Sequence, residues 1–263
     1  MKFYLFVFIL SSSFLYSQSS DLTSDYEVIY RIKCFDDTLS KKFASEENLS
    51  LLIKNQKSLF RSTQKAISDS IAMAIGMKAA NNPVNGIVVV DMKNVPGVYF
   101  KSEVFSNNGK QTVYKELMRN KLSYPLEDPI LWKIDSETKM IESYLCKKAT
   151  GKYKGRHYIA WFTPSIPIPD GPYIFKGLPG LILEVYDQSD TIHFSMVSFT
   201  KIAKPMILMK DAYGTKYSSF YKARKNMIEN AAGMLSNQTG ITLSPSSIER
   251  INNNAKRNNN YLD

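Results

Sequence analysis

The sequence predicts a mainly β protein, built on a single curved, bowl-like antiparallel sheet or half-barrel with one inserted helix and a C-terminal amphipathic helix. Short segments whose apolar side chains recur every second residue follow one another along the chain, and turn residues separate them. These segments do not alternate with helices, as the strands of a parallel sheet do. We therefore expect neighbouring strands to pair antiparallel.

The first 18 residues have the layout of a secretory signal peptide. Lys2 precedes an apolar stretch over Phe3–Leu10, and small and polar residues lead to Ser17 and Gln18. The stretch is too short for a membrane-spanning helix, and neither cysteine lies at the cleavage point, which disfavours a lipid anchor. We expect residues 19–250 to form one β-rich domain and the polar, asparagine-rich residues 251–263 to be a disordered tail.

The net charge of +10 indicates a basic surface. In an exported protein, anionic cell-surface polymers or an acidic protein are better candidates for a partner of this charge than nucleic acid. A generally basic, solvated surface remains the favoured explanation. We expect an exported protein of the periplasm or outer membrane, or a secreted one, whose partner is an envelope protein, a peptide or a glycan. No cofactor is predicted, and the sequence does not set an oligomeric state.

The first half of the chain contains five predicted strands and one predicted helix. In Tyr26–Cys34, apolar side chains alternate with Glu27, Arg31 and Lys33, as in a half-buried strand. Apolar residues at helical spacing predict a helix over Ser62–Ala80, and Asn81-Asn82-Pro83 ends it. The other predicted strands are Asn48–Lys54, Ile87–Met92, Gly97–Phe105 and Gln111–Leu117.

The second half contains two predicted hairpins and a terminal helix. The turns are Asp135–Thr138 and the polar Asp187–Asp190, and Thr215–Leu235 has the apolar spacing of a helix that packs on the sheet. The strands predicted in this half are Ile130–Ile134, Lys139–Cys146, Tyr153–Thr163, Leu181–Tyr186 and Thr191–Ile202.

No catalytic motif is present, but the cysteines, the histidines and Glu184 could form a disulfide, a metal site or a catalytic group. Cys34 and Cys146 are the two cysteines, and one disulfide between them is a candidate in an oxidising compartment. Cys146, His157 and His193 are weak candidates for a metal site or a cysteine–histidine nucleophile pair, against the simpler interpretation of histidines satisfied within strands. Glu184 is interpreted as a strand-face residue and not as half of a carboxylate pair with the turn-former Asp187.

A basic and aromatic segment lies between the second cysteine and the motif strand. If the strand is regular, Lys152, Lys154 and Arg156 lie on one side of it, and Tyr153 and Trp161 lie on the other. Such surfaces bind sugars, peptides or anionic polymers. Lysines that guard the edge of a sheet give the same pattern.

The segment Gly177–Glu184, GLPGLILE, resembles the signature of the GLPGLI family of exported proteins of Gram-negative bacteria. The resemblance extends over Cys146–Asp187 and includes Tyr153–Arg156 and Ala160–Phe162, Ile166-Pro167-Ile168 and Asp170-Gly171-Pro172. It implies an exported, strand-rich protein without an assigned function. The motif residues that we take as binding candidates are Tyr153, Arg156, Trp161, Asp170, Gly171, Pro172, Gly177, Leu178, Pro179 and Gly180.

Prolines decide the conformation of the segment that leads into this motif. Five prolines between Pro164 and Pro179 remove backbone donors, so we expect an extended crossover rather than a central strand. Gly177 and Gly180 mark places with positive φ or no room for a side chain, and Leu181–Leu183 should be buried on both faces. The sequence thus favours a non-enzymatic binding module; a carrier of an apolar ligand in a curved-sheet cavity and a metal protein or hydrolase are the alternatives.

Overall fold

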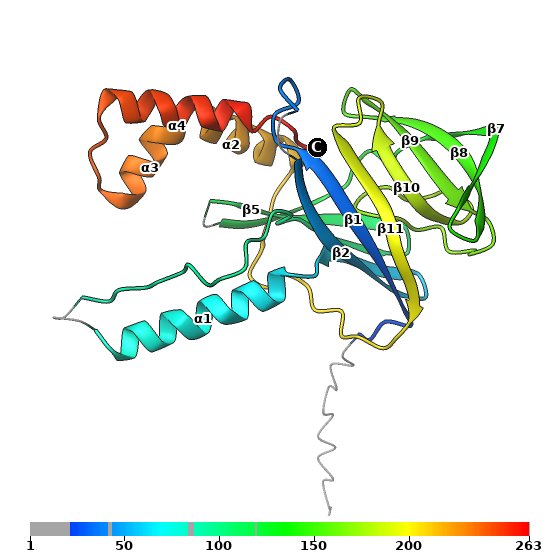
Figure 1. The fold of residues 1–263 in the computed structure, drawn as a ribbon, viewed down its shortest axis with the longest axis horizontal. Helices are drawn as coiled ribbons and strands as arrows, with labels where there is room; N and C mark the ends of the chain where they lie inside the picture. The colour runs from blue at the N-terminus through cyan, green and yellow to red at the C-terminus, as the bar shows by residue number, and fades with distance from the viewer. Residues whose placement is uncertain (1–21, 42–43, 84–86, 119, 263) are drawn as a thin grey trace, which may run out of the picture.

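The computed structural model describes residues 22–41, 44–83, 87–118 and 120–262, so the predicted signal peptide lies outside the described residues. The described chain forms one open 12-stranded sheet and four helices (Figure 1). The strand order is β12-β6-β5-β4-β3-β2-β1-β11-β10-β9-β8-β7. Every pair in it is antiparallel except β12 with β6, which confirms the predicted fold class.

Most strands precede the helices along the chain, and only α1 interrupts them. The strands are β1 (Tyr26–Phe35), β2 (Ala44–Lys54), β3 (Lys57–Ser62), β4 (Glu103–Asn107), β5 (Lys110–Leu117), β6 (Asn120–Pro125), β7 (Trp132–Ile141), β8 (Tyr144–Tyr153), β9 (Arg156–Thr163), β10 (Leu181–Asp187), β11 (Ile192–Lys201) and β12 (Tyr213–Gly214). The helices are α1 (Lys65–Asn81), α2 (Tyr217–Glu229), α3 (Ala231–Thr239) and α4 (Pro245–Arg257).

Strand β1 lies near the middle of the sheet and follows the predicted alternation. Val28, Tyr30 and Ile32 are fully buried, whereas Arg31 and Lys33 are exposed. A side-chain period of two produces this separation because successive Cβ atoms point to opposite faces. The hydroxyl of Tyr30 donates to the carbonyl of Ile182 at 2.7 Å, which connects the central strand to the strand of the motif.

One predicted turn of the second half is wrong in position, and one turn was not predicted. Residues 135–138 belong to β7, where the register with β8 shifts between Ile134 and Thr138, and the chain reverses at Glu142-Ser143, with φ of +50° at Glu142. The predicted strand over Tyr153–Thr163 also contains a turn. Lys154 and Gly155 both have positive φ, as a two-residue hairpin turn requires. Lys152, Lys154 and Arg156 therefore do not lie along one side of a single strand.

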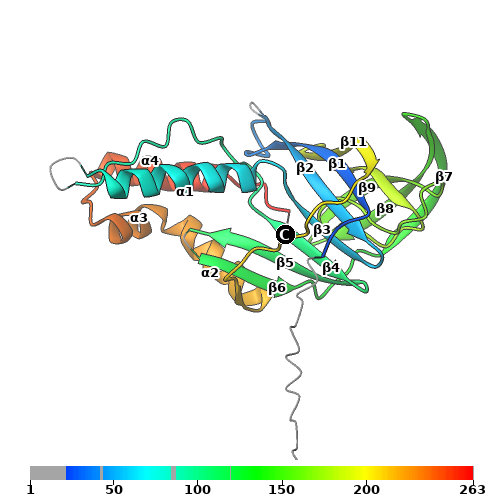
Figure 2. The ribbon, with the colours of Figure 1, turned by 90° about the horizontal axis from the view of Figure 1, so that it is seen from below.

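An arm made of α1 and the segment that returns to the sheet projects away from the strands (Figures 1 and 2). The helix confirms the prediction, but the strand predicted over Ile87–Met92 is wrong, because no strand of the sheet is formed there. Its β-branched residues are exposed, and within 87–92 only a single bridge, at Ile87, is formed. The predicted turn Asp187–Asp190 does join the antiparallel pair β10 and β11.

The C-terminal region holds three helices instead of the one predicted over Thr215–Leu235. Asn230, with φ of −127°, separates α2 from α3. Residues predicted to be disordered continue α4 as far as Arg257, because Ser244 accepts a bond from the backbone N–H of Ser247 and Pro245 occupies the first turn. Within the described residues, no helix has the length and apolarity needed to cross a membrane.

Candidate functional site

The crossover between β9 and β10 fills the interior of the curved sheet. Tyr173 and Phe175 are both 0% exposed. The Phe175 ring lies 4.8 Å from Tyr158 of β9 and 5.9 Å from Phe194 of β11, and the Tyr173 ring lies 5.6 Å from Phe100. These contacts make the crossover part of the core. As predicted, it belongs to no strand of the sheet, although it turns at Tyr173, where φ is +53°.

Close backbone packing explains the motif glycines. A Cβ at Gly180, whose φ is +153°, would lie 2.1 Å from the carbonyl oxygen of Thr163. A Cβ at Gly171 would lie 2.4 Å from the carbonyl oxygen of Phe175, and Gly177 has φ of +91°. The predicted lack of space and positive φ are thus both observed, and they hold the crossover against the sheet.

The other motif residues of the crossover have packing contacts. Asp170 forms an ion pair with Lys176, and both side chains are largely buried. The Lys176 ammonium also donates to Ser58 Oγ at 3.1 Å. Pro172 and Leu178 are buried, whereas Pro179 reaches the surface. The binding candidates of the crossover therefore hold it in place.

The two cysteines are free and buried, so the candidate disulfide is not formed. Cys34 is on β1 and Cys146 is on β8, and strands β11, β10 and β9 lie between these strands in the sheet. Burial raises the pKa of each thiol to about 11. Both are therefore protonated at neutral pH, and a thiol is a poor nucleophile and a poor metal ligand compared with a thiolate.

Cys146, His157 and His193 do not form a metal site. Among the described residues, no three histidine, cysteine or acidic side chains are grouped to hold a metal ion. His193 lies between two carboxylates, with Nε2 at 2.9 Å from Glu184 and Nδ1 at 3.0 Å from Asp190. His157 is exposed at the start of β9.

Glu184 is the centre of a charged cluster next to Trp161. The Lys139 ammonium pairs with Glu184 and lies 4.4 Å from the centre of the Trp161 ring. Bonding to Glu184 raises the pKa of His193 despite partial burial. Burial alone would raise the pKa of Glu184, but hydrogen bonds from His193 and Lys139 lower it. The charges of the cluster therefore compensate one another. Of the residues that the sequence predicts as site candidates, Trp161 and His193 both lie at this cluster, whereas Tyr153 lies at the far end of β8.

Arg156 connects the motif region to the C-terminal tail, which we define as residues 258–262. Its Nη1 donates to Oδ1 of Asn260 at 2.7 Å, and the Nδ2 of Asn260 donates to the carbonyls of Phe35 at 2.7 Å and Thr191 at 3.0 Å. The backbone N–H of Asn259 donates to the carbonyl of Asp36 at 3.0 Å. The tail is therefore seated against the ends of β1 and β11.

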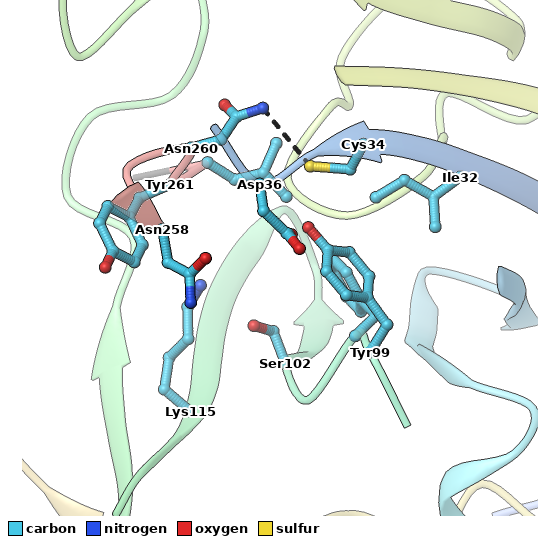
Figure 3. Close-up of a pocket in the computed structure, with 11 residues that line it drawn as sticks. Ile32, Cys34, Asp36, Tyr99, Ser102, Lys115, Asn258, Asn260 and Tyr261 are labelled. Atoms are coloured by element: carbon cyan, nitrogen blue, oxygen red, sulfur yellow. Dashed lines mark hydrogen bonds between the residues drawn. The ribbon is translucent and has the colours of Figure 1, made fainter. Parts of the chain in front are cut away.

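A pocket of about 380 Å³ lies beside the seated tail (Figure 3). Its volume is within the range of small-ligand sites. Asp36, Tyr99 and Lys115 supply polar groups, and the Lys115 ammonium lies 5.1 Å from the centre of the Tyr173 ring of the crossover. The complete lining is Ile32, Cys34, Asp36, Tyr99, Phe100, Ser102, Lys115, Asn258, Asn260, Tyr261 and Leu262.

The pocket combines charged and neutral hydrogen-bonding groups over an apolar floor. The Tyr99 hydroxyl and the Asp36 carboxylate point toward one another (Figure 3). Burial raises the pKa of Tyr99, and the neighbouring Cys34 and Asp36 raise it further, so the phenol stays neutral at physiological pH. This arrangement can bind a ligand with both donors and acceptors, and it holds no activated nucleophile among the groups described.

Sequence reasoning missed this pocket because its walls come from β1, the segment before β4, β5 and the tail. One signal was present in the sequence. Tyr261 and Leu262 are apolar residues at the end of a polar run, and the structure buries Leu262 and places the Tyr261 ring 4.4 Å from the Arg224 guanidinium.

Comparison with known proteins finds one family of unknown function and distantly similar solved structures. A family described as "Protein of unknown function (Porph_ging)" matches residues 152–184, from the end of β8 into β10. No curated protein matches the chain. Two solved structures of PNGF-II share 16% identity with it over 76% of this chain, with TM-scores of 0.49 and 0.48. The chain covers 32% of each PNGF-II chain, so it spans about a third of their length.

Proposed function

We propose that the chain is an exported, non-enzymatic binding protein of the cell envelope, of the GLPGLI type, and that its pocket binds an extended peptide segment of a partner protein. The seated tail carries this proposal. Residues 258–262 form a short segment without helix or strand, and they bind beside the pocket through both backbone and side-chain hydrogen bonds. A surface that holds one short peptide segment in this way is suited to another.

The pocket also carries charged side chains. Lys115 and Asp36 place opposite charges at its walls, and the basic chain favours an acidic or zwitterionic ligand. The alternatives have less support. The crossover fills the interior in which an apolar ligand would be carried, and the raised pKa values of both thiols disfavour a cysteine nucleophile or metal ligand.

A screen of random hexapeptides against the full chain tests the proposal. We expect the selected peptides to compete with one another and to bind the Lys115→Glu variant about tenfold more weakly, because a charge-assisted hydrogen bond is lost. Lys133→Glu, on exposed β7, makes the same charge change away from the pocket and should leave binding unchanged. Peptides that bind both variants equally, or a screen that selects no peptide, would contradict a peptide site at this pocket.

The exposed arm favours a second function, that of docking a protein. Met77, Ile87 and Val89 are 58%, 65% and 64% exposed, and exposed apolar surface of this extent marks interaction sites. A photoreactive residue at Met77 should give one dominant crosslinked species in cells, and Val89→Lys should remove it. A photoreactive residue at Leu131, which is 84% exposed beside β7, is the control. Equal crosslinking at Met77 and Leu131 would exclude docking at the arm.

A further inference from the structure

We propose, on the basis of that peptide-binding function, that the site recognises an asparagine side chain. The recognition site, which we call the carboxamide slot, is formed by the Arg156 guanidinium and the backbone carbonyls of Phe35 and Thr191. In this proposal the side chain of Asn260 occupies the slot until an asparagine-bearing segment of a partner protein displaces it.

The slot has the hydrogen-bonding pattern of a carboxamide. A carboxamide has one oxygen that accepts and one nitrogen that donates two hydrogens. In the slot, the oxygen of Asn260 faces the donor Nη1 of Arg156, and its nitrogen faces two carbonyl oxygens, with Cys34 Sγ at 3.5 Å. An aspartate would turn an oxygen toward those carbonyls, and an apolar side chain would leave the slot unpaired. The slot therefore distinguishes asparagine from both.

Groups other than the tail hold the slot in shape. Nη1 of Arg156 lies 3.7 Å from Oδ2 of Asp187, and the Asp187 side chain is 5% exposed. The Asp187 carboxylate accepts from the backbone N–H groups of Thr191 at 2.6 Å and Ile192 at 2.8 Å. The turn between β10 and β11 therefore positions both the guanidinium and the Thr191 carbonyl. The slot is preorganised without Asn260.

The tail is positioned to be a displaceable occupant. It follows the end of α4, has no helical or strand structure, and borders the pocket of about 380 Å³. A partner segment seated in the slot can also reach Lys115 and Asp36. Because the tail is tethered, it competes like a free peptide at a concentration on the order of millimolar.

The test uses the full chain and the probe acetyl-Asn-Asn-Tyr-Leu-amide, labelled for fluorescence anisotropy, which copies residues 259–262. We expect Asn260→Ala to bind this probe about tenfold more tightly than the natural chain, because the tethered competitor is lost. A probe with alanine in place of the second asparagine should lose at least about tenfold in affinity for Asn260→Ala. Asn253→Ala removes an exposed amide of α4 that lies outside both the slot and the pocket lining, and it should behave as the natural chain.

Asn260→Asp is the second variant in case Asn260→Ala does not fold, and we expect it to bind the probe more tightly for the same reason. Equal affinity for the asparagine and alanine probes, or no saturable binding to either variant, would overturn the asparagine slot. If the selected hexapeptides contain no asparagine but still bind Lys115→Glu more weakly, the asparagine slot is excluded and the peptide-binding function is retained. The two failures can therefore be told apart.

Discussion

The crossover of residues 164–180 and the tail of residues 258–262 differ in how their sequences relate to their roles. The crossover has a conspicuous motif of prolines and glycines. It is a packed interior segment in which Gly171 and Gly180 lie against neighbouring backbone. The tail has a plain polar sequence, yet its amides bind Arg156 and β1 and wall a pocket. A strong motif can thus record packing constraints, whereas a binding surface can depend on residues that carry no motif.

The largest expected effect tests the packing role of the crossover. Gly180→Ala should lower the free energy of unfolding by about 3 kcal/mol or more, because the new methyl meets a carbonyl at a φ of +153°. Urea denaturation measures it. Gly155→Ala, at a turn with φ of +83° and open space, should cost only about 1 kcal/mol. Similar losses at the two glycines would contradict the close packing of the crossover.

The next effect tests the docking of the tail. Arg156→Gln should raise hydrogen exchange at the amides of Asn259 and Asn260 by about tenfold or more, because a charge-assisted bond to the tail is lost. Exchange followed by mass spectrometry reports it. Arg61→Gln removes a bond of 2.9 Å to the Ile207 carbonyl instead, and it should leave the tail protected. Unchanged exchange in Arg156→Gln would show that the guanidinium does not hold the tail.

A smaller effect depends on pH and concerns the cluster at Glu184. The pKa of His193 is raised from 6.5 in the folded protein. Its contribution to the stability of the protein is therefore complete below pH 6.5 and is lost as pH rises through the pKa of the folded state. The pKa of Glu184 is lowered from 4.5, so its contribution is complete above pH 4.5 and is lost as pH falls through the folded value.

His193→Gln should therefore destabilise the protein most near pH 6 and little near pH 9. The loss at pH 6 should stay below about 1 kcal/mol, because the pair is partly exposed to solvent. Thermal unfolding at both pH values measures the difference. A loss of stability in His193→Gln that grows from pH 6 to pH 9 would contradict an ion pair at His193.

The smallest expected effect is on the cysteines. Because both thiols are free and buried, the native chain should react slowly with iodoacetamide, and the chain unfolded in urea without reductant should take up two labels. Intact mass gives the number. An unfolded chain that takes up no label until a reductant is added would restore the predicted disulfide.

The sequence predicts the parts of this fold that depend on local pattern. The alternation in Tyr26–Cys34 identifies β1, and helical spacing identifies α1, because burial of one face imposes the period. Turn positions at Glu142 and Lys154 were missed, since non-glycine residues adopt positive φ there. The pocket could not be predicted, because antiparallel pairing and helix packing bring Asp36, Lys115 and Asn260 together from distant parts of the chain.

Hydrogen exchange of the full natural chain, with and without a saturating asparagine probe, tests most directly whether the tail occupies a binding site. Without the probe, the amides of Asn259 and Asn260 are bonded to the Asp36 carbonyl and should be protected. The probe should raise exchange at residues 259–262 by displacing the tail, while β1 stays protected. Saturable binding of the probe that leaves exchange of the tail unchanged, or slows it, would contradict the account.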